Sequence, residues 1–481
     1  MHIKMELIKS WWSNMEEFDL IIIGSGSAGY VCAIRAADLG KKVLLIEKRE
    51  LGGTCLNRGC IPTKAILKAA EVYREAKESK VFGIDIKEIT FNPEEIKNWK
   101  DSVVKKLVSG LEILINSRKI LIKNGNGYLL DRNLVEVETE NGKERFKGKD
   151  IVIATGSEPA IFKNFNIDRV NVLTSDDALE LTEYPKEIVI VGAGAIGIEF
   201  ANFFNAFGVK VTIIEMMPQI IPTLKDKKIT NFMQRILEKR GIDFKLGVKI
   251  EEIKNKNGKV NLSLENGEVI ETEKVLVSIG RKFNTENIGL ENVGIKTEKE
   301  RIVVDEYLRT NIPNHYAIGD VTGGLLLAHK AMKEGEVVAE IISGEDVKMD
   351  YRVIPWVIFS NPEIATVGLT EEEAKSLGIS VIKGEFPFVA NGKAVSINST
   401  EGFVKIVADE KNHQIIGAQI IGYDASNLIG ELTLAIKNNL KLEDISDTIH
   451  THPTLSEAIL EASKVPLGSV IHIVNQLKKS F

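Results

Sequence analysis

The strongest constraint in this sequence is an internal repeat, because the segment from Ile21 to Glu47 recurs 168 positions later, from Val189 to Glu215. Each copy starts with an apolar run, turns on glycines spaced GxGxxG, continues through a helical stretch and ends with a second apolar run and a glutamate. This order is typical of a strand, a tight turn, a helix and a parallel strand. The repeat therefore predicts an α/β protein with two Rossmann-like domains.

Each copy also carries the groups of a dinucleotide site. Glycines let the backbone approach a pyrophosphate, the helix N-terminus favours its negative charge, and the carboxylate after the second strand can bind a ribose hydroxyl. Glu47 and Glu215 each follow the last glycine of their copy by 18 positions. One motif alone would also fit a plain strand-to-helix turn, whereas two in the same context predict two dinucleotide sites. The turn residues are Gly24, Gly26 and Gly29 in the first copy, and Gly192, Gly194, Ile196 and Gly197 in the second.

The length and charge of the chain narrow the class of protein. With 481 residues it is expected to form several domains, and its 62 basic and 68 acidic side chains argue against a mainly electrostatic nucleic-acid binder. The apolar runs are far shorter than the roughly 20 residues of a membrane helix, so no membrane span is expected. The first 19 residues mix Lys and Glu among apolar positions. We therefore expect no targeting signal and a cytoplasmic protein.

Two of the three cysteines, Cys55 and Cys60, lie in the segment GGTCLNRGCIPTK soon after the first repeat. On an ideal helix their side chains would point about 140° apart, so a disulfide between them needs a distorted turn, which Gly59 and Pro62 favour. In a reducing compartment this pair indicates redox chemistry. A zinc site would need further ligands, and two unrelated core cysteines are the remaining alternative.

Further motifs follow in order: ATGS at 154–157, GRKFNT at 280–285, YAIGD at 316–320 and HPTLSE at 452–457. With these motifs the chain resembles the flavin-dependent pyridine nucleotide–disulfide oxidoreductases from about Phe18 to its C-terminus. The resemblance implies FAD on the first glycine turn and NAD or NADP on the second. It also implies FAD-binding segments at 1–157 and 285–350, an NAD-binding domain at 158–284, and an α+β dimerisation domain at 351–481.

The resemblance implies a redox-active disulfide between Cys55 and Cys60, with Cys60 nearer the flavin. A role for Asp320 in binding the flavin also follows from its position, because a carboxylate after a buried strand can accept hydrogen bonds from ribitol hydroxyls. The alternative is that Asp320 caps the next turn. Beyond the turn residues and the two glutamates, the implied cofactor contacts are Lys48, Gly53, Thr54, Lys64, Gly127, Thr155, Gly156, Ser157, Gly280, Arg281, Gly319, Asp320, Leu327, Ala328 and His329. No metal ligands are expected.

His452 is implied to accept the proton of a substrate thiol, with Glu457 orienting the imidazole. The alternative is structural, because Thr454 and Glu457 have the spacing of a helix capping box and His452 would then be an ordinary loop residue. His450 is expected to have only a supporting role. Lys64 and Glu199 are implied to form an ion pair beside the flavin, the alternative for Glu199 being a solvated position on a helix.

The segment IPWVIFSNPEIATVGLTEEEA at 354–374 is similar to members of the family that oxidise protein-bound dihydrolipoamide and reduce NAD⁺. This implies a homodimer in which His452 serves the partner subunit's cysteines. No lipoyl domain is evident in the chain, so its partners would be lipoyl-carrying proteins of a 2-oxoacid dehydrogenase or glycine-cleavage complex. Phe283 and Arg58 depart from the pattern, since a proline and an aliphatic residue are usual there.

Three alternatives remain. The first is an NADPH-dependent reductase of a small disulfide such as glutathione, against which Glu215 argues because a carboxylate repels a 2′-phosphate. A mercuric-ion reductase would carry a C-terminal cysteine pair, which is absent because all three cysteines precede residue 61. The third is a non-catalytic flavoprotein subunit, against which the set of Cys55, Cys60 and His452 argues.

Overall fold

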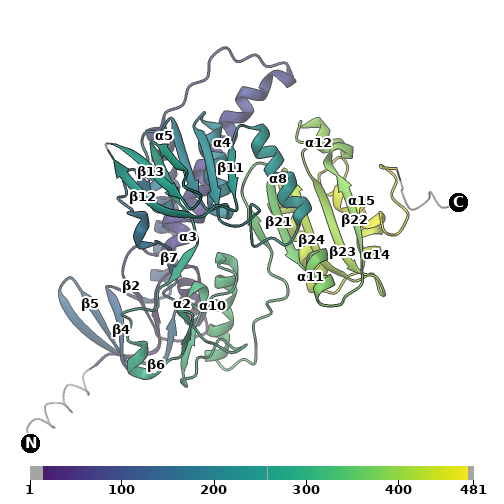
Figure 1. The fold of residues 1–481 in the computed structure, drawn as a ribbon. Coiled ribbons are helices and arrows are strands. Elements are labelled where there is room, and N and C mark those ends of the chain that lie inside the picture. The colour runs from purple at the N-terminus through teal and green to yellow at the C-terminus, as the bar shows by residue number, and fades with distance from the viewer. Residues whose placement is uncertain (1–14, 257, 475–481) are drawn as a thin grey trace, which may run out of the picture. The chain divides into compact units, whose positions relative to one another are not determined.

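The structure, a computed structural model, describes residues 15–256 and 258–474 (Figure 1). These residues form two compact units. The first contains the described residues up to Ala65, Lys97–Ala160 and Arg281–Asp350; the second contains Ile66–Ile96, the described part of Ile161–Gly280, and the described residues from Tyr351. The expectation about a targeting signal concerns mostly residues 1–14, which lie outside the described residues.

A mixed sheet forms the centre of the first unit, with the strand order β3-β2-β1-β6-β5-β4 and β19 paired to β6. The pairs among β3, β2, β1, β6 and β19 are parallel, and β4, β5 and β6 form an antiparallel meander. The strands are β1 (Glu17–Ile23), β2 (Val43–Glu47), β3 (Leu121–Asn124), β4 (Asn126–Asp131), β5 (Leu134–Thr139), β6 (Gly142–Ile153) and β19 (His315–Ala317).

Helices α2 (Ser27–Asp38) and α10 (Ala328–Ile342) of the first unit lie side by side (Figure 1). Small residues make this packing close, because a Cβ added to Gly335 would lie 2.5 Å from the carbonyl oxygen of Ala28. The other elements are α3 (Gly53–Arg58), β7 (Ser157–Pro159), β16 (Arg281–Phe283), α9 (Leu290–Val293), β17 (Thr297–Glu298) and β18 (Arg301–Ile302). Two longer helices, α4 (Cys60–Glu78) and α5 (Pro93–Ser117), have residues in both units.

The second repeat folds in the second unit as a parallel sheet in the order β11-β10-β9-β15-β8, beside an antiparallel sheet β12-β13-β14. The strands are β8 (Val172–Leu173), β9 (Glu187–Val191), β10 (Lys210–Glu215), β11 (Asp243–Leu246), β12 (Ile250–Lys256), β13 (Lys259–Leu264), β14 (Val269–Thr272) and β15 (Lys274–Val277). The helices are α6 (Ser175–Ala178), α7 (Ala195–Ala206) and α8 (Lys227–Lys239).

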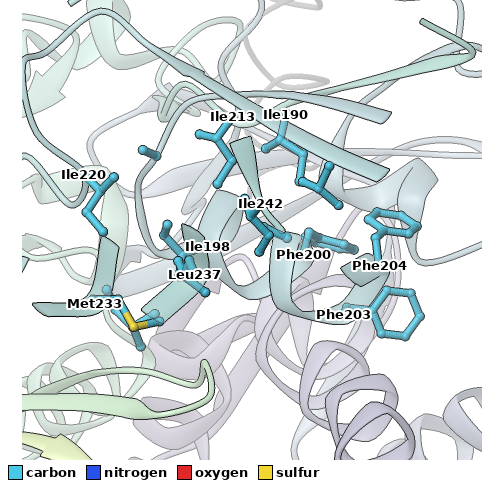
Figure 2. Close-up of a cluster of buried hydrophobic side chains, with 14 of the residues drawn as sticks. Ile190, Ile198, Phe200, Phe203, Phe204, Ile213, Ile220, Met233, Leu237 and Ile242 are labelled. Carbon is cyan, nitrogen blue, oxygen red and sulfur yellow. The ribbon is translucent and has the colours of Figure 1, made fainter. Parts of the chain in front are cut away.

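Helix α7 is apolar on most of its surface and contributes Phe200, Phe203 and Phe204 to the core of this part of the unit. Figure 2 shows these rings with side chains from β9, β10 and α8, among them Ile190, Ile213 and Met233. All six side chains are at most 2% exposed. A helix that is buried on nearly all sides must be positioned by packing, so the cluster holds the glycine turn in front of α7 rigidly.

The C-terminal part of the second unit is an antiparallel sheet in the order β20-β21-β24-β23-β22. Helix α13 lies on β21 and β24, and α15 lies on β22 and β23. The elements are β20 (Trp356–Ile358), β21 (Glu363–Gly368), α11 (Glu371–Ser376), β22 (Val381–Pro387), α12 (Gly392–Ser396), β23 (Phe403–Asp409), β24 (Ile415–Gly422), α13 (Ala425–Lys437), α14 (Leu442–Ser446) and α15 (Glu457–Lys464).

The predicted fold class is confirmed: the chain has two Rossmann-like sheets of the kind expected from the repeat, and a C-terminal α+β part. The two compact units do not separate the NAD-binding segment from the C-terminal segment. The four domain boundaries given above therefore stay a prediction.

Candidate functional site

The carboxyl ends of the parallel strands in the first unit meet at one edge, because Ile23 is paired with Ile46 and Ile153, and Ile153 with Ala317. The segments that follow these four residues are the first glycine turn, Glu47, the ATGS motif and the last three residues of the YAIGD motif. Ligands of open α/β sheets bind at such an edge. The fold thus brings together the main residues predicted to bind the first dinucleotide.

The first glycine turn has the geometry that its sequence predicts. Gly24 has φ +104°, which a side chain disfavours, and its N–H donates to the carbonyl oxygen of Ile46 at 2.8 Å. A Cβ added to Gly29 would lie 1.9 Å from the oxygen of Gly24. Gly26, in contrast, has open space where a Cβ would be. Gly24 and Gly29 are therefore required by the fold itself, and Gly26 leaves room for a ligand.

The second glycine turn repeats this geometry at the end of β9. Gly192 has φ +105° and donates to Ile214 at 2.8 Å, and a Cβ on Gly197 would lie 2.0 Å from the oxygen of Gly192. Gly194 again has open space at its Cβ position. Ile196 lies in the first turn of α7 and is half-buried. Two turns of nearly identical shape support two dinucleotide sites.

Each predicted ribose-binding carboxylate is held against its own glycine turn. The N–H groups of Ser25 and Arg49 donate to Glu47 at 2.8 Å each, and the hydroxyl of Ser25 donates to it at 2.7 Å. Glu215 accepts equivalent bonds from the N–H groups of Ala193 at 2.9 Å and Met217 at 2.8 Å. Both glutamates are 8% exposed. Because a carboxylate has about four acceptor positions, each retains capacity for a ribose hydroxyl.

Asp320 lies in a polar cluster at the same edge as the first turn. Its Oδ2 accepts a 2.5 Å hydrogen bond from the hydroxyl of Ser157, to which Arg281 Nε donates at 2.6 Å. Arg281 also donates to the carbonyl oxygen of Ser157 at 2.7 Å. Asp320 lies inside the short helix Gly319–Thr322, whose N-cap is Ile318, so Asp320 is not the capping residue of this helix. The arrangement therefore favours a ligand-binding role for Asp320 over a capping role.

Two further residues support this cluster and were not predicted. Asn284 Nδ2 donates to the carbonyl oxygen of Thr155 at 2.9 Å, and the hydroxyl of Thr155 donates back to the oxygen of Asn284 at 2.7 Å. Fully buried Glu334 accepts the N–H of Gly319 at 2.7 Å and pairs with buried Lys330 at 3.3 Å. The Lys330–Glu334 spacing on a helix with an apolar face was the available sequence signal for this pair.

The remaining predicted cofactor residues occupy several elements. Lys48 is exposed after β2, Gly53 and Thr54 begin α3, and Gly127 lies on β4, where an added Cβ would be 3.0 Å from the side chain of Ile23. Leu327 is the N-cap of α10, whose first residues are Ala328 and His329. Gly280 lies just before β16, and Arg281 is the first residue of that strand. Their roles toward a cofactor stay predictions.

The distorted turn predicted between Cys55 and Cys60 is present. Helix α3 ends at Arg58, Gly59 has φ −133° and ψ −111°, and α4 begins at Cys60. A Cβ on Gly59 would lie 3.0 Å from the oxygen of Thr54. No disulfide joins Cys55 and Cys60 in the structure, and their side chains are close enough to influence each other's ionisation.

The environment of Cys55 favours its protonated form. The hydrogen bond with Cys60, burial, and the nearby charge of Cys60 all raise the pKa of the Cys55 thiol, while the hydroxyl of Ser27 opposes that rise. Cys32 is fully buried in α2, and its burial also raises its pKa. A buried thiol of this kind is inert. Cys55 and Cys60 are thus the cysteines suited to exchange.

His452 and Glu457 are in direct contact, with 2.8 Å between His452 Nδ1 and Glu457 Oε1. The other oxygen of Glu457 accepts the N–H of Thr454 at 2.8 Å. Partial burial raises the pKa of the Glu457 carboxyl, but the hydrogen bonds from Thr454 and His452 outweigh this and hold the pKa below its ordinary value. His452 is 77% exposed in the side chain.

The capping-box alternative is only half realised. Glu457 accepts the N–H of Thr454, but the N-cap of α15 is Ser456, and the hydroxyl of Thr454 donates instead to the oxygen of Thr451 at 2.8 Å. Glu457 therefore has a structural bond and a bond to His452 at the same time. His450, in contrast, is 6% exposed in its side chain and contacts Glu431 at 2.9 Å, which fits a supporting role.

Lys64 lies in α4 of the first unit, and Glu199 lies in α7 of the second. Glu199 is 5% exposed and accepts the N–H of Phe359 at 2.9 Å, so the alternative of a solvated helix residue is wrong. The pairing of Lys64 with Glu199 stays a prediction. Among the described residues there is no group of three or more His, Cys, Asp or Glu side chains placed to hold a metal ion. Within that same part of the chain, no helix is both long and apolar enough to cross a membrane.

Comparison with known proteins agrees with this geometry. Residues 18–335 match the family described as pyridine nucleotide-disulphide oxidoreductase, and residues 354–463 match its dimerisation domain. The dihydrolipoyl dehydrogenases of Geobacillus stearothermophilus and Bacillus subtilis are 44% and 42% identical to the chain. The matches cover 96% and 95% of this chain and 98% of each relative.

Two solved structures are similar over nearly the whole chain. The Cu(II) complex of the HOCl-induced flavoprotein disulfide reductase RclA from Escherichia coli is 29% identical with a TM-score of 0.86, covering 94% of this chain and 99% of that protein. LpdA from Mycobacterium tuberculosis has a TM-score of 0.89 at 24% identity, covering 93% and 99%, and supports the fold alone.

Proposed function

Because the chain belongs to the pyridine nucleotide-disulphide oxidoreductase family, we propose that it oxidises protein-bound dihydrolipoamide to lipoamide and passes the electrons through FAD to NAD⁺. One observation carries the proposal: the dithiol of Cys55 and Cys60 directly follows the first of two equal glycine turns, in a chain 44% identical to a dihydrolipoyl dehydrogenase. The alternative of a non-catalytic subunit leaves this dithiol unexplained.

The residues present fit both cofactors. The first glycine turn, Glu47 and Asp320 would hold the pyrophosphate, a ribose and the ribitol of FAD, and the second turn with Glu215 would hold NAD. When bound, FAD takes two electrons from the dithiol and passes them as hydride to the nicotinamide. The protein's own groups bind the cofactors, orient the sulfurs and move the substrate protons.

The first exchange step starts from the oxidised form, in which Cys55 and Cys60 share a disulfide. Since Nδ1 of His452 donates to Glu457, Nε2 holds a lone pair and can take the proton of a substrate thiol. The resulting substrate thiolate attacks the sulfur of Cys55 and forms a mixed disulfide. The Cys55–Cys60 bond breaks, and its electron pair leaves with Cys60 as a thiolate.

The second exchange step closes the product disulfide. The remaining thiol of the substrate attacks the substrate sulfur of the mixed disulfide, and its proton ends on the sulfur of Cys55 that this attack releases. The bond to Cys55 breaks, and its electron pair leaves with Cys55. The substrate is then oxidised by two electrons, and Cys55 and Cys60 are left as a reduced pair.

Preference for NAD over NADP follows from the second turn. Glu215 is buried there at the end of β10, and the two residues after it, Met216 and Met217, are 66% and 45% exposed and bring no positive charge. A carboxylate accepts hydrogen bonds from a ribose 2′-hydroxyl and repels a 2′-phosphate. This argues against the alternative of an NADPH-dependent reductase.

Arg58 brings a positive charge close to the cysteine pair, which would suit a small disulfide substrate that carries carboxylates. Its guanidinium forms an ion pair with Glu50, so its charge has a compensating partner within the same segment. A substrate carboxylate would have to compete with Glu50 for Arg58. This favours a neutral amide-linked substrate over glutathione disulfide.

The dimerisation domain supports a homodimer. We place His452 in the site of the partner subunit's Cys55 and Cys60, because its imidazole is highly exposed on that domain although Glu457 holds it in a defined orientation. The substrate would be carried by a separate lipoyl protein of a 2-oxoacid dehydrogenase or glycine-cleavage complex, and the enzyme would act in the cytoplasm.

A paired assay tests the function. The purified protein should contain FAD, reduce NAD⁺ with dihydrolipoamide, and lose this turnover in the Cys55→Ser variant, which should still bind FAD. Oxidised glutathione with NADPH should give little turnover. Faster turnover with glutathione than with lipoamide substrates would favour the reductase alternative, and no turnover with either would favour the non-catalytic one.

A further inference from the structure

The hydroxyl of Ser25 has no counterpart in the second glycine turn, where Ala193 occupies the same place. The backbone N–H groups of both residues donate to the carboxylate of their own turn, Ser25 to Glu47 at 2.8 Å and Ala193 to Glu215 at 2.9 Å. Glu215 is thus held without a hydroxyl, so a turn of this shape does not need one. The hydroxyl of Ser25 therefore serves a feature that only the first turn has.

That feature is the segment from Gly52 to Cys60, which we call the redox segment because it carries Cys55 and Cys60. Ser25 Oγ donates to Glu47 Oε2 at 2.7 Å and accepts the N–H of Gly52 at 3.2 Å. Ser25 is fully buried and Gly52 is buried too, so water does not compete for these bonds. Two successive hydrogen bonds therefore join the start of the redox segment to the carboxylate predicted to bind a ribose of FAD.

The backbone of the redox segment also contacts the first turn where the segment starts. Gly52 has φ +91° and is the N-cap of α3, and a Cβ added to Gly53 would lie 2.6 Å from the Cα of Gly26. The side chain of Asn57 donates to the carbonyl oxygens of Leu51 at 2.9 Å and Gly53 at 3.0 Å. Because these bonds brace α3 against its own N-terminal end, the place of Gly52 sets the place of the cysteines that follow.

We propose that Ser25 is a positioning residue that makes FAD binding and the placement of the redox segment depend on each other. This rests on the proposed function only in that FAD occupies the first turn. A ribose hydroxyl bound to Glu47 would fix the carboxylate, the carboxylate fixes the hydroxyl of Ser25, and the hydroxyl fixes the N–H of Gly52. By linkage, a correctly placed redox segment strengthens FAD binding by the same factor by which FAD stabilises the segment.

Hydrogen exchange in the FAD-loaded protein tests the contact with Gly52. Ser25→Ala is expected to fold, because the second turn has alanine at this place and the same glycine conformations. In this variant the peptide with Gly52 and Cys55 should exchange about 3- to 10-fold faster, the usual effect of losing one hydrogen bond. The peptide with the second turn should be unchanged. An unchanged rate in the redox segment, or equal acceleration in both peptides, would overturn the proposal.

The matched control is Ser79→Ala, which removes another buried hydroxyl, one that donates to the carbonyl oxygen of Ala76 at 2.8 Å. It should leave the exchange of the redox segment unchanged. The same acceleration in Ser79→Ala as in Ser25→Ala would mean that the effect is not specific to the first turn and would overturn the proposal.

The rate of FAD release distinguishes a link between the two features from a purely structural role of Ser25. It is followed as the flavin that separates from the protein on gel filtration over time. Asn57→Ala removes the brace within the redox segment and should speed FAD release about 3- to 10-fold when Ser25 is present. In the Ser25→Ala background, which already releases FAD faster, the same change should add little, because the link is gone.

Equal acceleration by Asn57→Ala in both backgrounds, or none in either, would overturn the proposal. None of these measurements requires turnover. A protein that shows the coupling without oxidising dihydrolipoamide would therefore contradict the proposed substrate and leave the role of Ser25 standing.

Discussion

His452 Nδ1 and Glu457 Oε1 lie 2.8 Å apart, while the second oxygen of the same carboxylate accepts the N–H of Thr454. The carboxylate is therefore anchored to the backbone and cannot rotate freely away from the imidazole. This anchoring leaves Nε2 of His452 as the basic nitrogen and directs it away from Glu457.

His452→Gln should slow reduction of the enzyme by dihydrolipoamide by about 10²- to 10⁴-fold, the usual contribution of a general base. Reduction of the bound flavin by NADH should change far less, because no substrate thiol loses a proton in that half-reaction. Stopped-flow measurement of the two half-reactions separately checks this. Equal slowing of both would argue for a structural role of His452.

A mixed dimer tests whether the site is shared. Co-expressed, tag-selected heterodimers of a His452→Gln chain and a Cys60→Ser chain should recover about half the native activity, because one of the two sites then has all its groups. Each variant alone should be inactive. If verified heterodimers show no recovery, His452 acts on its own subunit or has no part in the chemistry.

The lowered pKa of Glu457 predicts how the stability of the folded protein depends on pH. A carboxyl whose pKa is lower in the folded protein stabilises it above the unfolded value, here 4.5, and loses that contribution as the pH falls through the folded value. The unaltered protein should therefore have a higher Tm than Glu457→Gln at neutral pH, and the difference should shrink below about pH 4.5. Glu410→Gln, which alters an exposed residue after β23, should show no such trend in thermal scans.

Gly26→Ala and Gly194→Ala form a matched pair, because both positions have open space at the Cβ and ordinary backbone angles. Neither change should lower the Tm of the cofactor-free protein appreciably. Gly26→Ala should lose FAD, since the added methyl group blocks approach of the pyrophosphate, whereas Gly194→Ala should keep FAD and bind NAD more weakly. Flavin absorbance and NAD titration distinguish the two; loss of FAD from both variants would contradict separate sites.

Glu215→Ala should raise the KM for NAD⁺ by roughly 10- to 100-fold, as expected for losing hydrogen bonds to a charged group. FAD content should be unchanged, because Glu47 occupies the equivalent position in the first turn. Steady-state kinetics with NAD⁺ and NADP⁺ provide the measurement. An unaltered protein that uses NADP⁺ as well as NAD⁺ would show that Glu215 does not select the cofactor.

Lys405→Met should destabilise the protein by about 3–5 kcal/mol, the cost of leaving one partner of a buried ion pair uncompensated. Lys405 pairs with Asp226 and both side chains are at most 5% exposed; Asp226 is also the N-cap of α8. Chemical denaturation gives the free energy of unfolding. Exposed Lys411→Met is the control, and an equal loss there would mean that the buried pair contributes nothing specific.

The local sequence pattern was sufficient to predict much of the fold and part of the candidate site. The repeat predicted both glycine turns, and the turn between Cys55 and Cys60 followed from Gly59 and helix geometry. These features depend on φ, ψ and side-chain type over a few neighbouring residues, so a sequence carries them directly. The motifs that follow these strands then lie together at one edge of the sheet, because parallel strands in register end at the same edge.

Only the tertiary structure decided which side chains meet across long sequence separations. Glu199 is buried and accepts the N–H of Phe359, which its sequence position did not predict. The sequence also did not predict the bond between Ser25 and Gly52 or the bond between Glu334 and Gly319 at the cofactor edge. The sequence determined the turns and the reactive residue types by itself, because local sterics set them. Their hydrogen-bond partners were decided by how sheets and helices pack, since a contact between distant positions exists only after the chain has closed the intervening loop.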